Sequence, residues 1–441
     1  MRYVSQIFQP IITIPKNAKI KNTEITCKSQ KLLLECGLVR PTSSGLFTLL
    51  PLACRALDKL EALVRSCLEE VGGQRVSLPA LTAEGLWEKT GRLHQVGTEL
   101  LKLRDRHEKI YLLAPTHEEA IADLLADVGP LSYKQLPLLL YQISSKYRDE
   151  HRPKHGLLRA REFIMMDAYG AHADVDDATA VYNKMTRQFR RLFQRLQLPV
   201  YRVQAPSGDM GGSLSHEWQL RANAGEDALC VCSSCSHSQR DTGNATCDEC
   251  GKEMEKCNSI EVGHTFILGT KYSAPLAANF TSSSQSQGLP VVMSCYGIGI
   301  TRLLAASLEA LSSEKSLRWP KAIAPHSAII IGPKEGSKEW FSFSSDKLNR
   351  LHALLSSTHA LNDVLLDDRH SYTIGKRLMM ADRLGYPTII VCGRSTLESP
   401  PRFEVYHPNP DKDVSMLLMT EEELLGHLNK EENHVLIDNK I

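Results

Sequence analysis

The fold of this chain is decided by residues 147–169, which read YRDEHRPKHGLLRAREFIMMDAY. Two β-rich runs, 138–148 and 159–168, flank an irregular loop and predict an antiparallel hairpin. This hairpin would bring Arg148 near Arg159 and Phe163. Guanidinium groups bind phosphate, and a phenyl ring stacks on adenine. The hairpin therefore suits an anionic ligand with an aromatic base, although a salt-bridged surface hairpin would have the same residues.

A second segment with similar chemistry follows further along the chain. Residues 289–295 predict a strand, and Gly297-Ile298-Gly299 then leads into a helix from about residue 301 to residue 311. Glycines at these positions would let the strand turn tightly into the helix. Arg302, in the first helical turn, would point at a ligand beside the sheet. A lone Gly-x-Gly is weak evidence, and packing alone would explain it.

The remaining periodicity predicts an α+β fold and not an alternating βαβ array. Apolar residues at helical spacing predict helices over 57–71 and 175–196, the first followed by a strand that stops at Pro79. Thr116-x-x-Glu119 predicts a capping box for a helix that ends near Leu125. After residue 325, strand-like runs alternate with helical segments, which predicts a separate small α/β domain over 325–441.

Taken together, these segments resemble the class II aminoacyl-tRNA synthetases. Arg148-x-Glu150 followed by Arg159 and Phe163 resembles their motif 2, and Gly297-x-Gly299-x-x-Arg302 resembles motif 3. The helix and the strand ending at Pro79 resemble motif 1, which builds the dimer in that class. The order and the separation of the three segments match the class.

Four further segments are similar to the prolyl-tRNA synthetase family of bacterial type: residues 115–119, 163–169, 211–217 and 225–227. The resemblance implies a class II catalytic domain with an antiparallel sheet over 28–324 and an α/β anticodon-binding domain over 325–441. It also implies ATP with Mg²⁺, L-proline and tRNA(Pro) as substrates, and a homodimer. The alternatives are a threonyl, seryl or histidyl synthetase, or a non-catalytic accessory subunit with a class II-like fold.

The resemblance also implies roles for single residues. Arg148 and Arg302 would be catalytic, and ATP would be bound by Arg148, Glu150, Arg159, Phe163 and Arg302. Proline would be bound by Thr116, Glu118, Arg148 and His216, with Glu118 accepting from the secondary ammonium. One departure from the family is Met166, where lysine is usual. The missing cation suggests a lower affinity for ATP.

The segment between Asp227 and Glu261 has only 33 residues, 228–260. Many bacterial relatives carry a large editing domain between motifs 2 and 3, so this chain is not expected to hydrolyse mischarged alanyl-tRNA. Cys232-x-x-Cys235 and Cys247-x-x-Cys250 have the spacing of a structural zinc site. Cys230 and Cys257 are alternative ligands, and a cysteine-rich loop without metal is the other interpretation.

Charge and composition bound the remaining expectations. The net charge of +1, from 52 basic and 51 acidic residues, excludes a protein held on nucleic acid by bulk charge alone. Local contacts with the anticodon are expected from the C-terminal domain, at Arg369, Lys376, Arg377 and Arg383. No apolar run approaches the ~18 residues that cross a bilayer. Residues 1–27 contain basic side chains and no acidic residue before Glu24, which fits a transit peptide or a merely frayed terminus. Together with the resemblance to the bacterial-type family, this leader suggests a location in the mitochondrial matrix.

Overall fold

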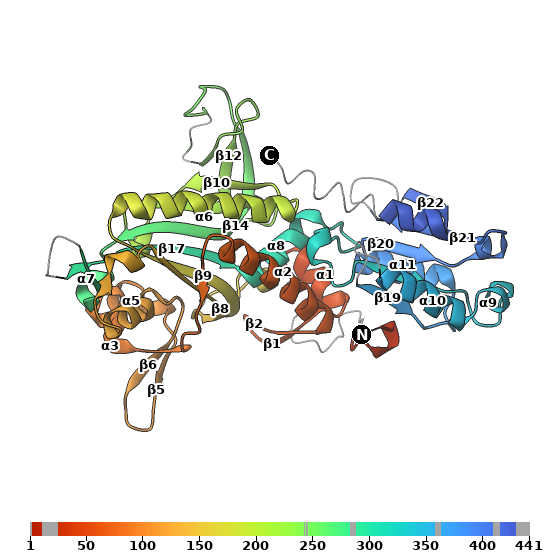
Figure 1. Ribbon diagram of the computed structural model, residues 1–441, viewed down its shortest axis with the longest axis horizontal. Coiled ribbons are helices and arrows are strands. Elements are labelled where there is room, and N and C mark those ends of the chain that lie inside the picture. Colours follow the sequence, from red (N-terminus) through yellow and green to blue (C-terminus); the bar gives the residue numbers. More distant parts are fainter. Residues whose placement is uncertain are drawn as a thin grey trace. The chain divides into compact units, whose positions relative to one another are not determined.

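The computed structural model describes residues 2–10, 25–241, 243, 246–282, 288–357, 363–408 and 415–428. The chain forms two compact units (Figure 1). The larger unit contains Pro41–Phe47 and Leu60–Ala306, and the smaller unit contains the described parts of Met1–Arg40, Thr48–Lys59 and Ser307–Ile441. The borders of these units differ from the domain boundaries that the sequence predicts after residues 27 and 324. Those boundaries therefore stay predictions.

The larger unit is built on a nine-stranded sheet in the order β10-β11-β14-β17-β9-β8-β3, and β12 and β13 extend it beside β14. All pairs are antiparallel except that of β3 with β8. The expected α+β class is confirmed. The strands are β3 (Gln74–Arg75), β8 (Leu138–Tyr147), β9 (Glu162–His172), β10 (Val200–Gln204), β11 (Leu214–Arg221), β12 (Asp227–Val231), β13 (Ser238–Arg240), β14 (Glu255–Gly269) and β17 (Val292–Gly299).

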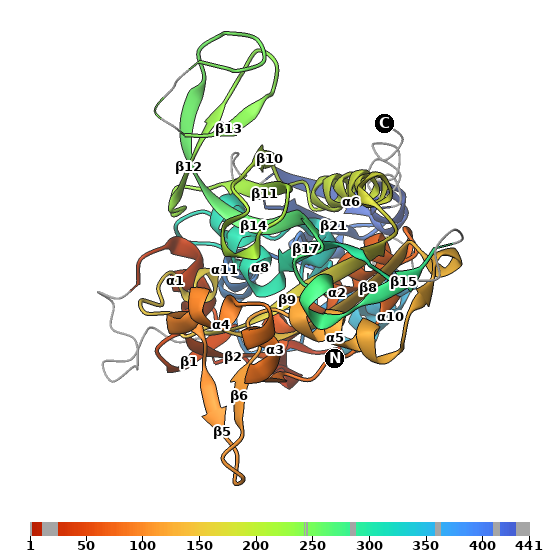
Figure 2. The same ribbon diagram turned by 90° about the vertical axis from the view of Figure 1, so that its left-hand side faces the viewer.

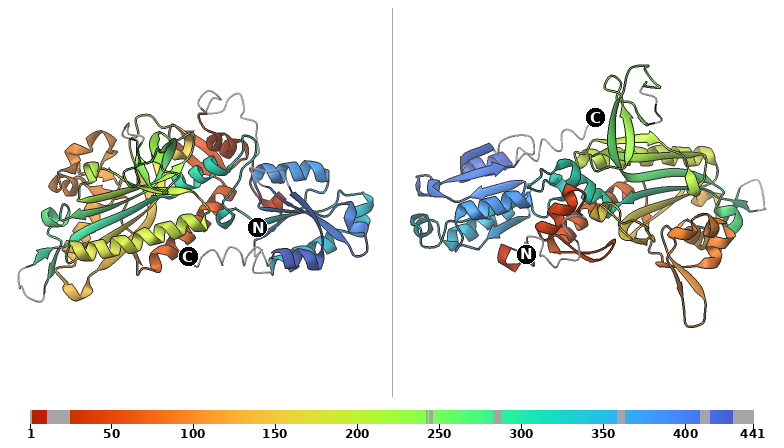
Figure 3. Two further views of the ribbon diagram at one scale, coloured as in Figure 1. Left: turned by 90° about the horizontal axis from the view of Figure 1, so that it is seen from above. Right: turned by 180° about the vertical axis from the view of Figure 1, so that it is seen from behind.

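One face of this sheet is covered by the long helix α6 (Val175–Arg195), which packs on β9, β14 and β17 (Figure 3). Asp174 caps the helix by accepting from the backbone N–H of Asp177. Its apolar stripe is buried: the rings of Phe189 and Phe193 lie 5.5 and 5.6 Å from the ring of Trp218 on β11. The opposite face of the sheet is therefore the one left open to form a cavity.

Short elements surround that opposite face. They include a three-stranded sheet of β4 (Leu81–Ala83), β6 (Ile110–Leu113) and β5 (Lys102–Arg104), and a second one of β16 (Leu289–Pro290), β15 (Asn279–Thr281) and β7 (Leu131–Ser132). The helices are α3 (Glu84–Lys89), α4 (Arg92–Gln95), α5 (Glu118–Asp127) and α7 (Ser273–Leu276). The chain also forms α1 (Lys28–Glu35), β1 (Val39–Ser43), β2 (Leu46–Leu49), α2 (Pro51–Glu69) and α8 (Ile300–Leu311). No helix in the described ranges is long and apolar enough to cross a membrane.

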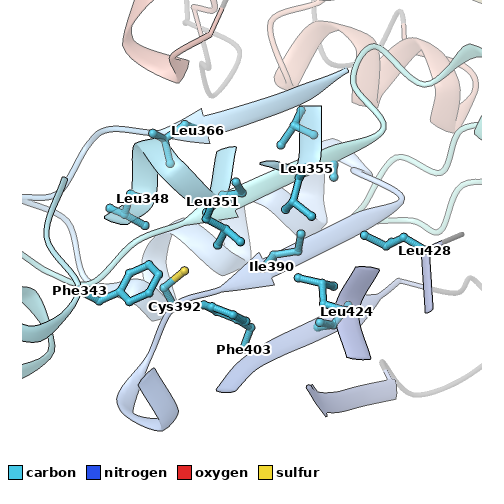
Figure 4. Packing of buried hydrophobic residues seen from close by; sticks show 14 residues of the cluster. Phe343, Leu348, Leu351, Leu355, Leu366, Ile390, Cys392, Phe403, Leu424 and Leu428 are labelled. Carbon is cyan, nitrogen blue, oxygen red and sulfur yellow. The ribbon is translucent and has the colours of Figure 1, made fainter. Parts of the chain in front are cut away.

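The smaller unit contains a mixed sheet in the order β19-β18-β20-β21-β22. The first three strands are parallel, as expected for an α/β fold, and β21 and β22 continue the sheet in antiparallel fashion. Buried leucines of α10 and aromatic residues such as Phe403 fill the core (Figure 4). The elements are β18 (Ala328–Ile331), α9 (Lys338–Ser342), α10 (Ser345–Ser356), β19 (Val364–Asp367), α11 (Ile374–Leu384), β20 (Thr388–Val391), β21 (Arg402–His407) and β22 (Ser415–Thr420).

The first residues of the chain lie along the edge of this smaller sheet. Tyr3 forms a parallel bridge with Leu366 on β19, and the N–H of Leu366 donates to the carbonyl of Arg2 at 2.9 Å. The guanidinium of Arg2 donates to Asn349 Oδ1 at 2.8 Å. Part of the expected leader is thus bonded to the C-terminal sheet. Residues 11–24, which carry its other basic side chains, lie outside the described residues.

Candidate active site

A cavity of about 370 Å³ opens on the face of the large sheet that α6 does not cover. Strands β9, β14 and β17 form its floor, and the loop 206–210, α4 and the start of α5 form its sides. Its lining includes five of the residues that the sequence predicts for the site: Thr116, Glu118, Arg148, Phe163 and Arg302. The structure therefore brings the two arginines, 154 positions apart in the sequence, to one cavity.

Arg148 and Arg302 give this cavity a positive wall. The guanidinium of Arg148 lies 5.2 Å from the ring centroid of Phe163, and no carboxylate among the described residues lies within ion-pair distance of it. Arg302 donates to the carbonyls of Leu158 and Glu261 at 2.9 and 3.3 Å. Burial and the charge of Arg302 lower the pKa of Arg148. Such a pair of cations would be stabilised by an anionic ligand such as a phosphate group.

Two further residues that the sequence predicts for the ATP site lie outside this cavity. Arg159 binds Glu150 at 2.8 Å and Glu226 at 2.9 Å, and both Glu150 and Arg159 line a separate pocket beside the 149–161 loop. Lys154 also pairs with Glu226. The structure therefore assembles the loop through ion pairs and does not bring Glu150 or Arg159 to Arg148.

Thr116 and Glu118 lie together at the start of α5. Thr116 Oγ1 donates to Glu118 Oε2 at 2.5 Å, and the side chain of Glu118 is buried. The expected capping box is wrong: the N-cap residue is His117, and no side-chain bond caps the helix. The hydroxyl of Thr116 is directed to a carboxylate in the cavity wall, and this explains why it does not cap the helix.

His216 faces away from the cavity because side chains alternate along β11. Its Nδ1 lies 2.7 Å from the hydroxyl of Tyr182, and it lines another hollow with Arg190 and Arg202. Burial and the charge of Arg202 lower the pKa of His216 to about 4. The structure does not bring this histidine to Thr116 and Glu118.

The histidine at the cavity is His264, which the sequence reasoning missed. Ser215, the neighbour of His216, lies 2.7 Å from His264 Nε2, and His264 Nδ1 lies 2.9 Å from Glu261. Burial opposes ionisation of Glu261, but His264 and the two arginines hold its pKa below the usual value. Because side chains alternate along β11, Ser215, and not His216, lies on the same face as this site.

A buried polar chain supports the Thr116 loop from beneath. Lys146 Nζ lies 2.7 Å from Asp167 Oδ1, and Tyr169 donates to Asp167 Oδ2 at 2.8 Å. The Tyr169 hydroxyl accepts from the N–H of His117 at 2.9 Å. Burial opposes the charge of Asp167, but its hydrogen bonds and Lys146 hold its pKa below the usual value. This network fixes the backbone that presents Thr116 and Glu118.

Met166 is buried on the other face of β9. Phe163, Met165, Asp167 and Tyr169 line the cavity, and Met166 does not. The period of two along a strand places a side chain at 166 on the opposite face. A lysine at this position would therefore not point into the cavity, and the expected loss of ATP affinity has no support in the geometry.

The four predicted cysteine ligands come together: Cys232 and Cys235 lie between β12 and β13, and Cys247 and Cys250 lie between β13 and β14. Figure 2 shows the projection that these strands form. The four sulfur atoms all lie within 4.8 Å of one another, and the pairs 232–250 and 235–247 are 3.5 and 3.6 Å apart. Four sulfurs around one zinc ion at ~2.3 Å would be about 3.8 Å apart. The cluster Cys232, Cys235, Cys247 and Cys250 could therefore bind zinc, whereas Cys230 and Cys257 are not in it.

The four basic residues expected to contact the anticodon differ in their surroundings. Arg377 is buried and donates to the carbonyls of Gly332 and Pro333 at 2.6 and 3.2 Å. Arg369 is paired with Asp367 at 2.6 Å, and Arg383 with Glu35 at 2.7 Å. Lys376 is exposed, and its ammonium lies 3.8 Å from the ring centroid of Tyr372, an exposed aromatic residue that the sequence reasoning missed.

The fold and this cavity define the core of a class II aminoacyl-tRNA synthetase. Residues 101–311 match the family model of the tRNA synthetase class II core domain (G, H, P, S and T). Two solved structures share the fold. The prolyl-tRNA synthetase of Giardia lamblia with prolyl-adenylate has a TM-score of 0.77 at 18% identity, covering 93% of this chain and 81% of that one. That of Cryptosporidium parvum with halofuginone and AMPPNP has a TM-score of 0.74 at 15% identity, covering 93% and 77%.

Comparison with the sequences of known proteins identifies the family within this class of synthetases. The chain is 45% identical over 397 residues to the probable mitochondrial proline–tRNA ligase of Homo sapiens, covering 88% of this chain and 82% of the relative. It is 35% identical over 398 residues to the proline–tRNA ligase of Ehrlichia chaffeensis, covering 86% and 91%. The chain belongs to the proline–tRNA ligase family.

Proposed function

We propose that this chain activates L-proline with ATP to prolyl-adenylate and transfers the prolyl group to the 3′ end of tRNA(Pro). The observation that carries the proposal is the single cavity shared by Arg148, Arg302, Thr116 and Glu118. Membership of the family supports the overall reaction. The contacts in the cavity support the role that is proposed for each residue.

In the first step a carboxylate oxygen of proline attacks the α-phosphorus of ATP, and the bond to pyrophosphate breaks. Two anions must approach, so the reaction needs cations held in place more than it needs a nucleophilic side chain. Arg148 would lie between carboxylate and α-phosphate, and Arg302 would hold the distal phosphates. Phe163 would stack on adenine, and Mg²⁺ bound with ATP would supply further positive charge to the phosphates. In the second step a ribose hydroxyl of tRNA attacks the carbonyl carbon, and AMP leaves.

Proline would be held at the wall of the cavity that Thr116 and Glu118 form. Its secondary ammonium would donate to Glu118, whose carboxylate is buried and already accepts from Thr116. A buried carboxylate binds an ammonium strongly because little water competes for it. Glu150 and Arg159 would act on the nucleotide only after the 149–161 loop exchanged its ion pairs.

The finer features of this function are proposed with it. The enzyme would work as a homodimer in the mitochondrial matrix, a location that mitochondrial relatives support. It would lack editing of alanyl-tRNA in cis, since 228–260 is a short segment. The cysteine cluster would hold a structural Zn²⁺. Lys376 and Tyr372 would offer a cation and a stacking face to an unpaired base of the anticodon, and Arg369 and Arg383 would first have to leave their carboxylate partners.

The proposal is tested by ATP–pyrophosphate exchange with proline, alanine, threonine, serine and histidine. We expect exchange with proline alone. Arg148→Lys should lower kcat/KM by roughly 100-fold or more, since the loss of one preorganised charge donor costs about that much. Glu314→Gln, which alters an exposed residue of the smaller unit, is the control. Exchange with another of these amino acids would assign a different synthetase, and no exchange at all would favour an accessory subunit.

A further inference from the structure

We propose that Arg92 is a positioning residue for proline recognition, because it holds the paired carboxylates of Glu118 and Glu119 in the wall of the cavity. This inference rests on the proposed function, in which Glu118 accepts the ammonium of proline. Arg92 comes from α4, outside every segment that resembles a synthetase motif, and its side chain nevertheless lines the cavity with Thr116 and Glu118.

Arg92 contacts two buried carboxylates at the same time. Its Nη1 lies 3.1 Å from both carboxylate oxygens of Glu119 and 3.4 Å from Glu118 Oε2. Thr90 Oγ1 also donates to Glu119 Oε1, at 3.0 Å. The Glu118 oxygen that Arg92 contacts is the same one that accepts from Thr116. Arg92 and Thr116 therefore hold the same oxygen of Glu118, which restricts how its carboxylate can turn in the cavity.

Aromatic rings hold the guanidinium itself in place. Its carbon lies 4.6 Å from the ring of Trp87 and 5.5 Å from that of Tyr272, and Nη2 lies 3.2 Å from Met210 Sδ. The side chain of Arg92 is only 4% exposed. A planar cation stacked on aromatic faces has little freedom to turn, and a lysine ammonium would not be held in the same way.

The charges of this cluster are unbalanced in a way that suits a cationic ligand. One guanidinium faces two buried carboxylates, and burial raises the pKa of Glu119 while Arg92 opposes that shift. Among Arg92, Glu118 and Glu119 alone, a secondary ammonium placed at Glu118 would balance the second negative charge. The other titratable and charged groups facing the two acids are Lys146, Arg148, Tyr169, Lys271, Tyr272 and Cys295.

Removal of Arg92 should therefore weaken the binding of proline and leave the binding of ATP unchanged. Without the cation, little offsets the rise that burial and the charge of Glu118 cause in the pKa of Glu119, so Glu119 takes up a proton more readily and the Glu118 carboxylate loses a fixed partner. In Arg92→Gln we expect the KM for proline to rise roughly tenfold or more, as for the loss of a charged hydrogen bond. We expect this KM to rise further as the pH falls from about 8 to about 6, and the KM for ATP to stay within about twofold.

The test is ATP–pyrophosphate exchange by the full chain over that pH range, with thermal unfolding as a check on folding. Arg92→Lys keeps the charge and should restore part of the affinity and the flat pH profile. Arg318→Gln, which removes a half-buried arginine paired with Asp382 in the smaller unit, is the matched control. A lower kcat or melting temperature with an unchanged proline KM and pH profile, in either Arg92 variant, would overturn the inference.

Glu118→Gln separates this inference from the proposed function. If Glu118→Gln raises the KM for proline and the Arg92 variants do not, the positioning role is wrong and the proline site stands. If Glu118→Gln leaves the KM for proline unchanged, the proposed proline site itself is wrong, and the inference about Arg92 is rejected with it.

Discussion

Single positions in this site are decided by the face of a strand on which a side chain lies. On β9, alternate residues from Phe163 to Tyr169 line the cavity, whereas Met166 is fully buried on the other face. On β11 the same alternation separates Ser215 from His216. A motif gives the spacing of residues along the chain, but the face follows only when one residue of the strand is already known to touch the cavity.

Met166→Lys tests this argument. We expect the KM for ATP to remain unchanged, because the ammonium would not face the cavity. We expect the free energy of unfolding to fall by about 3 kcal/mol, because the variant buries an unpaired charge among apolar side chains. Exchange kinetics and urea unfolding measure the two effects, and Met166→Leu, of similar volume, is the control. A lower KM for ATP in the lysine variant would restore the idea that this chain lacks a useful cation.

The residues that the sequence could predict are those with a recognisable motif. Arg148, Phe163, Arg302, Thr116 and Glu118 all reach the cavity. Arg92, Glu261 and His264 line it as well, but they belong to none of the motifs that the sequence analysis used. Glu150 and Arg159 lie next to the cavity and form ion pairs with each other. The spacing of residues along the sequence cannot predict with which partner a charged side chain forms an ion pair when several partners are close.

At the scale of elements, the sequence predicted the long helix α6 and the strand β8 with nearly the observed bounds, whereas β9 begins three residues and ends four residues later than predicted. The prediction of a capping box failed at the start of α5, because the hydroxyl of Thr116 donates to the carboxylate of Glu118 and does not cap the helix.

The cysteine-containing turns next to β12 and β13 show a pattern of a different kind. Each Cys-x-x-Cys turn is closed by a backbone bond, Ser236 N–H to Cys232 O at 2.9 Å and Gly251 N–H to Cys247 O at 2.8 Å.

These two turns share a backbone conformation, and this similarity supports the proposal of a metal site. The residue after each second cysteine has a positive φ, 60° at Ser236 and 70° at Gly251. Few apolar side chains are packed around these turns among the described residues: the buried cluster there consists of Cys230, Cys232, Cys247 and Met254. The turns therefore depend on bonds between their thiol groups or on an ion that joins them.

We expect the purified protein to contain about one zinc per chain. Cys235→Ser should remove it and make residues 232–252 sensitive to proteolysis, whereas proline-dependent exchange should stay within about threefold because the cavity lies on other strands. Cys54→Ser, at an exposed cysteine of α2, is the control. Elemental analysis and limited proteolysis measure the outcome. A metal-free protein with a protected hairpin would show that the cluster is only a reduced thiol cluster.

At the scale of the whole molecule, composition and the change of rhythm near residue 325 were enough to predict an α+β region and a separate α/β region. They could not show that residues before the first motif join the C-terminal sheet. Val4 and Ile7 are buried there, and Ser5 N–H donates to Asp368 Oδ1 at 3.0 Å. Bonds between segments more than 360 positions apart leave no periodic trace in a sequence.

Val4→Ser should lower the free energy of unfolding of the smaller unit by about 2 kcal/mol, since it exposes an apolar contact and leaves a hydroxyl in its place. Phe8→Ser is the matched control, because Phe8 is 68% exposed. Thermal unfolding of the two variants compares them directly. Equal effects at positions 4 and 8 would contradict the docking of this segment.

The position of residues 2–7 bears on the prediction that residues 1–27 are a transit peptide. A receptor can read a basic leader only as a free peptide, and here Arg2 and Tyr3 are bonded to Asn349 and Leu366 once the sheet has formed. Translocation would have to come before folding. Afterwards, a peptidase that cut beyond residue 9 would expose the backbone of β19 as an open edge, available to any extended peptide nearby.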